Sequence, residues 1–229
     1  PAILLASYLE YKLLKERLNI QPDLVCGHSL GEYTALLAAE SFNLNDALNI
    51  VHKRGSLMEK SPPGSMYAIL NTELDVIREC CLRASSELNK ISSPANINSK
   101  KQVVISGHSE SVELSVKYLK ERGARKCIKL NVSVASHCEL MNEAASSFEE
   151  VIDESAITNP KYNFLNNYDA CFINEISDIK EKLVKQLTSP VQWVNIMELV
   201  KKREGIFIEC GPKNVLSGLA KANGIDNIY

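Results

Sequence analysis

Apolar residues recur along the chain at two alternating spacings, one typical of helices and one typical of short buried strands. Residues 2–17 place apolar side chains at helical intervals, and the run PDLVC at 22–26 is short and β-prone. Residues 30–40 and 45–60 are again helical in spacing and rich in strong helix formers. The first quarter of the chain is therefore predicted as helix, strand, helix, helix, with Ser29 at the turn that follows the strand.

A break at SPPGS, residues 61–65, introduces a segment with a different order of elements. The patterns beyond it predict strands at 65–70, 102–107 and 126–132, helices at 72–85 and 109–123, and a loop through 93–101 that leaves room for an extra strand at 95–97. This order predicts a ferredoxin-like α+β subdomain over residues 65–131, inserted into a core made of residues 1–64 and 132–229.

The remainder of the chain alternates helices with short strands. The patterns predict helices at 138–154, 177–187 and 191–204, short strands at 162–167 and 169–174, a buried strand at 206–210, and a turn followed by a helix within 211–222. Strands that alternate with helices predict an α/β fold, and we expect a parallel-sheet core of the α/β-hydrolase type.

Composition excludes several classes of protein. Of the 229 residues, 45% are hydrophobic and 24% are charged, and the formal net charge is -2, which is ordinary for a soluble domain and unlike a nucleic-acid binder. No apolar run approaches the roughly 20 residues that span a membrane. The start of the chain lacks the basic region and small-residue cleavage site of a signal peptide. We expect neither a nucleic-acid partner nor a membrane partner.

The seven cysteines are scattered along the sequence, and no CxxC pair occurs. This spacing argues against a disulfide framework and against a zinc site, so we expect reduced thiols, no metal and a cytoplasmic protein. The chain begins with proline inside a helical pattern, which is typical of a fragment or of a processed chain.

The stretch VCGHSLGEY places Ser29 in a Gly-x-Ser-x-Gly motif between Gly27 and Gly31. At a turn from strand to helix this motif is typical of a nucleophile elbow, in which a strained serine projects its hydroxyl beside the helix N-terminus. The backbone N–H of Leu30 is then the natural donor to a developing oxyanion. The alternative interpretation is a serine that only caps the helix.

A serine nucleophile needs a base, and the histidines of the chain differ in their suitability. His137 lies in a short extended loop before a helix, where a base is held by rigid neighbours, so we expect it to be the base. His28 directly precedes Ser29, and adjacent side chains on such a turn point apart, so we expect His28 to shape the pocket rather than to act as the base. His52 is predicted in the middle of a helix, where a surface or packed histidine is more common, and we expect His108 to have a structural role.

An acidic partner for the base is not obvious after Ser29. Asp169 is a weak candidate, since an aspartate in a turn is the more common situation. A backbone carbonyl that accepts from the histidine can take the place of an acid. Arg54, 25 residues after Ser29, is either a solvated arginine or a fixed guanidinium that binds a carboxylate on the acyl group.

Several motifs together resemble those of the malonyl-CoA:acyl-carrier-protein transacylases, the acyltransferases of type II fatty-acid synthesis. They occur in the same order as in that family and cover nearly the whole chain: GHSLGEYTALLAAE, RGSLM, PANINSKKQVVISG, VSVASHCELM, SPVQW and IFIECGPKNVLSGL.

This resemblance implies a ping-pong enzyme without a cofactor that moves a malonyl group from malonyl-CoA to the phosphopantetheine thiol of acyl carrier protein. Ser29 corresponds to the nucleophile, His137 to the general base and acid, and Arg54 to the arginine that pairs with the malonyl carboxylate. Gln186 corresponds to the residue whose backbone carbonyl orients the histidine, and Met58 to a residue that lines the pocket. We expect a monomer.

The resemblance also implies roles for residues of the predicted subdomain. Asn96 and Asn98 correspond to polar residues near the active site. Arg125 and Lys126 correspond to basic positions that dock the acidic carrier protein, and the alternative is a solvated basic face.

Two departures from the family pattern bear on these expectations. The Gly-Gln-Gly-Ser sequence, whose glutamine would supply a second oxyanion N–H, does not occur in this sequence. The loop before His137 has Ala135 where the family commonly has proline, and its Ala-Ser-His also resembles acyltransferases that take methylmalonyl groups. Two alternatives to the transferase are a serine esterase or thioesterase and a non-catalytic fragment that binds the carrier.

Overall fold

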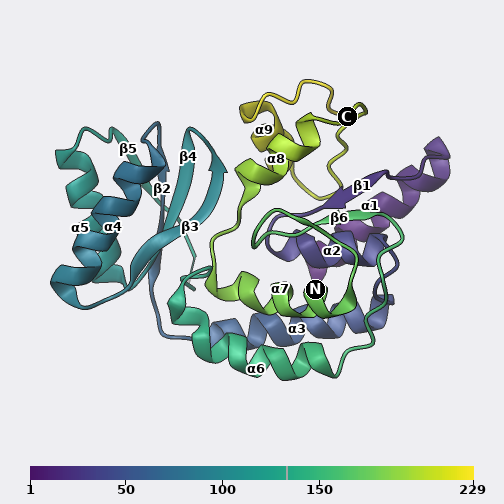
Figure 1. Ribbon diagram of the computed structural model, residues 1–229, viewed down its shortest axis with the longest axis horizontal. Helices are drawn as coiled ribbons and strands as arrows, with labels where there is room; N and C mark the ends of the chain where they lie inside the picture. The colour runs from purple at the N-terminus through teal and green to yellow at the C-terminus, as the bar shows by residue number, and fades with distance from the viewer. Residues whose placement is uncertain (133) are drawn as a thin grey trace.

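The structure is a computed structural model that describes residues 1–132 and 134–229 (Figure 1). It is an α/β protein with two sheets, each accompanied by its own helices. The helices and strands follow the order predicted from the sequence in most places. Two runs differ, one at 93–101 and one at 206–210, and both are described below.

The sheet β1–β6–β7 lies at the centre of the larger part. Strand β1 (Leu24–Cys26) runs parallel to β6 (Asn163–Leu165), and β7 (Phe172–Ile173) pairs antiparallel with β6. The helices of this part are α1 (Ala2–Leu18), α2 (Leu30–Ala38), α3 (Leu44–Glu59), α6 (Asn142–Asp153), α7 (Ile176–Thr188), α8 (Trp193–Lys201) and α9 (Val215–Ala222), with the 3-10 turn η1 (Glu139–Met141) before α6.

A buried apolar cluster joins α2, α3, α6 and α7 below this sheet in the view of Figure 1. Tyr33 and Phe148 are among its largest fully buried side chains, and their rings meet edge to face. The helices follow the apolar spacing of the sequence because each must turn one stripe toward this core. The cluster holds α2, and therefore the turn that precedes it, against α3, while α6 packs on α3 and α7 packs on α6.

The antiparallel sheet β3–β4–β2–β5 forms the second part of the molecule. Its strands are β2 (Ser65–Leu70), β3 (Ser92–Ser99), β4 (Gln102–Gly107) and β5 (Lys126–Lys129). Helices α4 (Leu74–Leu88) and α5 (Ser109–Glu121) cover one face of it (Figure 1). The order of elements is strand, helix, strand, strand, helix, strand.

The loop predicted over 93–101 is wrong, because most of this run belongs to the edge strand β3; the extra strand considered at 95–97 is present. The sequence here is rich in Pro, Asn and Ser, which favour turns. An edge strand tolerates Pro94, which lacks a backbone N–H, and two irregularities in its register with β4 accommodate the remainder. Pairing with β4 overrides the local preference for a turn.

The buried strand predicted at 206–210 is also wrong. Within the residues that the structure describes, this run forms a single bridge, between Phe207 and Ile228, and Ile206 is 60% exposed. A short apolar run becomes a buried strand only where a neighbouring strand pairs along its length, and one bridge does not meet that requirement.

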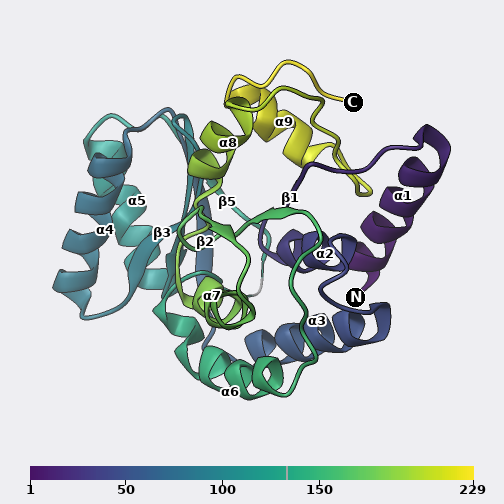
Figure 2. The ribbon, with the colours of Figure 1, turned by 45° about the vertical axis from the view of Figure 1, so that its right-hand side comes forward.

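The two parts of the molecule are joined at β3. Val191 donates to Ala95 O and accepts from Ile97 N, both at 2.9 Å, and Asn223 at the end of α9 donates to Asn98 O. Figure 2 shows α8 lying between the antiparallel sheet and α9. In the described part of the chain, every helix is too short or too polar to cross a membrane.

Candidate active site

Ser29 sits on the turn between β1 and α2 in a backbone conformation that is rare for a residue with a side chain. Its φ is 52° and its ψ is -105°. A Cβ atom on Gly27 would lie 2.0 Å from the carbonyl oxygen of Gly31, so the close crossing of the chain requires glycine at 27. The serine occupies the N-cap position of α2, but its hydroxyl makes no capping hydrogen bond. The helix-cap interpretation of Ser29 is therefore wrong.

His137 is the histidine that faces this hydroxyl. Ser29 Oγ lies 2.8 Å from His137 Nε2, and His137 Nδ1 lies 2.8 Å from the backbone oxygen of Gln186. Because a carbonyl only accepts, Nδ1 carries the proton and Nε2 is left to accept from Ser29. The backbone N–H of His137 donates to Leu187 O, so the end of α7 holds both the main chain and the ring of this residue.

The other histidines and Asp169 do not reach the serine hydroxyl. The Nε2 atom of His28 lies 2.8 Å from Asn98 Oδ1. His52 is exposed on α3, and His108 accepts from the backbone of Ile91. Asp169 accepts from groups of its own turn and forms an ion pair with Lys182.

Arg54 reaches the serine from α3. Its Nη2 atom donates to Ser29 Oγ at 3.1 Å and to Gln186 Oε1 at 3.0 Å, and its guanidinium carbon lies 5.4 Å from the ring centre of Tyr33. The side chain is 6% exposed, and its Nε atom has no partner in the described residues. A buried cation whose donors are only partly used is suited to binding an anionic group beside the serine.

Burial sets the protonation of the histidines. It lowers the pKa of His137 from 6.5 to about 3, and the charge of Arg54 acts in the same direction while the bond to Gln186 opposes it. Burial also lowers the pKa of His28, against the effect of its bond to Asn98. His137 is therefore neutral near pH 7, which is the state in which Nε2 can accept a proton.

Sequence reasoning did not identify a set of buried polar residues behind the serine. Asn167 accepts from Ser29 N at 2.7 Å and donates to Gly27 O at 2.7 Å, and the side chain of Gln186 donates to Ser29 O and to Glu32. The one available signal was the Ser-x-x-Glu spacing of Ser29 and Glu32, which is typical of a capping box. That motif predicts a bond from Glu32 to Ser29 N, whereas the N–H binds Asn167.

The remaining predicted residues are found in three places. Leu30 is the first residue of α2, so its N–H has no acceptor within the helix. Asn96 and Asn98 are buried on β3, and Met58 packs against the core cluster at the end of α3. Arg125 and Lys126 are exposed at the start of β5.

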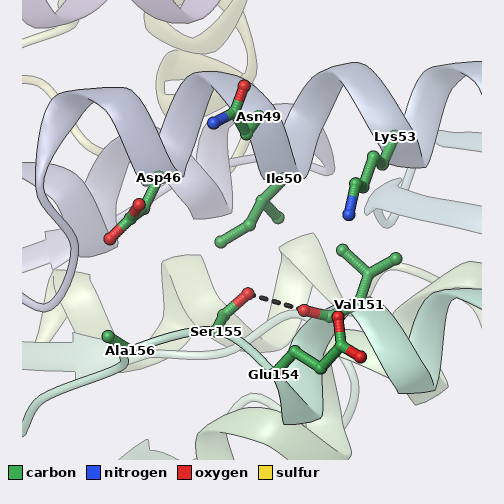
Figure 3. Close-up of a pocket in the computed structure, with 8 residues that line it drawn as sticks. All are labelled: Asp46, Asn49, Ile50, Lys53, Val151, Glu154, Ser155 and Ala156. Atoms are coloured by element: carbon green, nitrogen blue, oxygen red, sulfur yellow. Dashed lines mark hydrogen bonds between the residues drawn. The ribbon is translucent and has the colours of Figure 1, made fainter.

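Two cavities lie away from the serine. One, of about 380 Å³, is lined by Arg125 and Lys126 together with Leu70, Asn71 and Gly123. The other, of about 250 Å³, lies between α3 and the end of α6 (Figure 3) and is lined by Asp46, Asn49, Ile50, Lys53, Val151, Glu154, Ser155 and Ala156. The second cavity contains none of the predicted site residues. No group of three or more His, Cys, Asp or Glu side chains could hold a metal ion anywhere in residues 1–132 and 134–229.

The chain is similar to known proteins over most of its length. Residues 2–221 match the family described as "Acyl transferase domain". The chain is 39% identical over 227 residues to the malonyl CoA-acyl carrier protein transacylase of Haemophilus influenzae, which covers 96% of this chain and 72% of the relative.

Solved structures are equally similar. The malonyl CoA-acyl carrier protein transacylase of Coxiella burnetii superimposes with a TM-score of 0.94 at 36% identity, over 98% of this chain and 72% of that one. A malonyl-transacylase solved in complex with its type II PKS acyl-carrier protein superimposes with a TM-score of 0.93 at 34% identity, over 98% of this chain and 73% of that one.

Proposed function

Since this chain belongs to the acyl transferase domain family, among the malonyl-CoA:acyl-carrier-protein transacylases, we propose that Ser29 carries the malonyl group as an ester between two thiols. The donor is malonyl-CoA, and the acceptor is the phosphopantetheine thiol of an acyl carrier protein, in support of fatty-acid synthesis. The enzyme is thus a malonyltransferase with a ping-pong mechanism.

The observation that carries this proposal is the position of Arg54. Its Nη2 atom lies 3.1 Å from the Oγ atom of Ser29, inside a buried site. A neutral acyl group carries no charge with which a fixed cation beside the nucleophile could pair. The free carboxylate of a malonyl group can form such a pair. The geometry therefore favours an acyl group that carries its own acid.

Acylation begins when Ser29 Oγ attacks the thioester carbonyl of malonyl-CoA and His137 Nε2 takes the hydroxyl proton. The carbonyl oxygen becomes an oxyanion beside the N-terminus of α2, where the N–H of Leu30 can donate to it. The carbon–sulfur bond then breaks, and the CoA thiolate takes the proton from His137. The Gln186 carbonyl keeps the imidazole in the tautomer that this step needs.

Transfer to the carrier repeats these events in reverse order. The phosphopantetheine thiol gives its proton to His137 Nε2 as the sulfur attacks the serine ester. The bond between the acyl carbon and Ser29 Oγ breaks, and the serine oxygen recovers the proton from His137. Because one histidine serves both half-reactions, each requires His137 to begin neutral.

The other predicted positions complete this proposal. His28, held by Asn98, and the buried Asn96 support a polar wall of the acyl pocket, with Met58 as an apolar contributor. Arg125 and Lys126 dock the acidic carrier, which their exposure supports.

We extend the proposal to the finer architecture. An elbow between β1 and α2, with β1 parallel to β6, supports an α/β-hydrolase-like core over residues 1–64 and 132–229. The strand order β3–β4–β2–β5 with α4 and α5 on one face supports a ferredoxin-like subdomain over 65–131. All seven cysteines lie in the described residues and none is in a disulfide there, which supports a cytoplasmic location.

Incubation with malonyl-CoA followed by intact-protein mass spectrometry tests the proposal. We expect one malonyl adduct on the unmodified chain, its loss upon addition of a phosphopantetheinylated carrier protein, and no adduct on Ser29→Ala. Undiminished labelling of Ser29→Ala would remove the serine from the mechanism. No adduct on the unmodified chain would favour a non-catalytic carrier-binding role.

A further inference from the structure

Glu32 is a buried carboxyl group to which the proposed reaction assigns no step. It lies in the first turn of α2, three residues after Ser29, and is 1% exposed. Burying a carboxyl group is costly unless its oxygens are hydrogen-bonded. Both oxygens of Glu32 are bonded: Oε1 accepts from Asn167 N at 3.0 Å, and Oε2 accepts from Gln186 Nε2.

Each of these bonds leads to Ser29. Asn167, held by Glu32 through its backbone, accepts from Ser29 N through its side chain. Gln186, held by Glu32 through Nε2, donates from the same atom to Ser29 O at 3.1 Å. The strained main chain of the serine is therefore clamped on both sides by amides that Glu32 anchors.

The bond to Gln186, together with the bond from the same Nε2 atom to Ser29 O, decides which way this amide faces. A carboxylate only accepts hydrogen bonds, so the NH2 group of Gln186 must face Glu32 and the Oε1 atom must face away. That Oε1 atom is the acceptor of Arg54 Nη2 at 3.0 Å. With the amide reversed, an NH2 group would face the guanidinium, donor against donor, and Arg54 would lose its acceptor.

We propose that Glu32 is a positioning residue for Arg54: its carboxylate fixes the orientation of the Gln186 amide, and this amide holds the guanidinium at the serine hydroxyl. Glu32 thereby sets the preference of the site for acyl groups that carry a carboxylate, without touching the acyl group itself. This assignment rests on the proposed malonyl transfer at Ser29.

Ionisation of Glu32 gives the assignment a pH signature. Burial raises the pKa of Glu32 to about 8, while its bonds with Gln186 and Asn167 and the charge of Arg54 act in the opposite direction. Asp169 also raises this pKa, and Glu32 in turn raises the pKa of the Cys26 thiol and of the Tyr33 phenol. Burial raises the pKa of both Cys26 and Tyr33, so neither group titrates in the neutral range.

The variant Glu32→Gln isolates the amide orientation. Its carbonyl can still accept from the immobile N–H of Asn167, which leaves its NH2 group facing the NH2 group of Gln186, donor against donor. The Gln186 amide then loses this bond or turns away from it, and either change loosens the hold of Oε1 on Arg54. Above the pKa of about 8 of Glu32, where its carboxyl group is ionised, we expect kcat/KM for acylation by malonyl-CoA to fall on the order of 10- to 100-fold, the range for a lost hydrogen bond to a charged group. Acylation by acetyl-CoA, which has no carboxylate, should change less than about threefold.

A double-mutant cycle separates positioning from general structural support. In an Arg54→Ala background, Glu32→Gln should cause no further loss with malonyl-CoA, because its effect passes through the arginine. Equal losses for malonyl and acetyl groups, or the same loss with and without Arg54, would overturn the proposal. The matched control is Glu143→Gln, the same change at an exposed residue in the first turn of α6.

Two readouts complete the test. The ratio of malonyl to acetyl acylation should rise from about pH 7 to about pH 9 in the unmodified chain and stay flat in Glu32→Gln; a ratio with the same pH dependence in both would contradict the assignment. The 15N resonances of the Arg54 guanidinium should broaden or shift in Glu32→Gln. If the unmodified chain forms no acyl-enzyme, the proposed function fails, and unchanged Arg54 resonances would separately overturn the positioning role.

Discussion

The imidazole of His137 donates its Nδ1 proton to the main-chain carbonyl of Gln186 across 2.8 Å, at the place where a serine triad has a carboxylate. A carbonyl fixes the tautomer as a carboxylate does, but it brings no negative charge to stabilise an imidazolium ion. With Arg54 nearby and burial acting in the same direction, the ring is held neutral. The ring can therefore accept a proton at neutral pH without first losing one.

We predict that acylation tolerates acid unusually well. The pKa of His137 falls from 6.5 to about 3 in the folded chain, so the acid limb of kcat/KM for acetyl-CoA, whose acylation does not depend on the ionisation of Glu32, should lie well below pH 6.5. Because this folded pKa is depressed, the contribution of His137 to stability is complete above 6.5 and is lost as the pH falls toward about 3. A pH–rate profile checks this, and an acid limb centred near 6.5 would contradict a buried neutral ring.

Arg54→Ala should separate transfer of a malonyl group from hydrolysis of a neutral ester. The loss of a charge-assisted contact to the carboxylate should lower kcat/KM for malonyl-CoA on the order of 100-fold. Hydrolysis of a neutral ester such as p-nitrophenyl acetate should hardly change. Arg54→Lys should recover only part of the malonyl activity, since an ammonium group cannot pair bidentately. An equal loss on both substrates would favour a serine esterase or thioesterase.

Gly27→Ala should destabilise the elbow. The added Cβ atom would meet the Gly31 carbonyl at 2.0 Å, a backbone atom that cannot move without opening the turn. We expect a loss of about 1–3 kcal/mol or more in the free energy of unfolding, measured by urea titration. Gly218→Ala in α9 is the matched control, because its Cβ would meet no atom within 4 Å and alanine favours a helix. Similar stability for both variants would refute the steric argument.

Reversing the charges of Arg125 and Lys126 should impair only the second half-reaction. With both changed to Glu, we expect kcat/KM for the carrier protein to fall about tenfold at low salt, with the difference shrinking as salt screens the charges. The acylation rate with malonyl-CoA should stay the same. The control is Lys117→Glu with Lys120→Glu, which changes the net charge by the same amount on the exposed face of α5. Equal effects of the two pairs would indicate net charge rather than docking.

The sequence predicted the elbow because all of its signals are local. The short run at 24–26, the glycines at 27 and 31 and the helix formers after Ser29 each act within a few residues. The hydrogen-bond partners Arg54, His137 and Gln186 lie 25, 108 and 157 residues from Ser29 in the sequence. The residues alone left Arg54 open between a solvated side chain and a guanidinium that binds a carboxylate, and they gave Gln186 no role. The family resemblance supplied the role of Gln186 and favoured the second interpretation of Arg54.

Glu32 and Asn167 were missed for a related reason. A glutamate in the first turn of a helix normally faces water and favours the helix dipole, so its pattern gives no sign of burial. Asn167 lies in a turn, where asparagine needs no further explanation. Only the packing of the turn after β6 against the start of α2 brings them together. Likewise, β3 and the run at 206–210 were misjudged because pairing with another segment decided their structure: β3 pairs with β4, whereas the run at 206–210 forms a single bridge within the described part of the chain.

The main-chain contact between His137 and Gln186 also has an evolutionary consequence. Every amino acid, proline included, presents a carbonyl at position 186, so no single substitution there deletes the acceptor that aligns the base. The side chain at the same position meanwhile contacts Arg54. Mutational drift at this one site can therefore retune which acyl groups are accepted while the base keeps its alignment. A triad that relies on an acidic side chain has no such latitude, because one codon change removes its support.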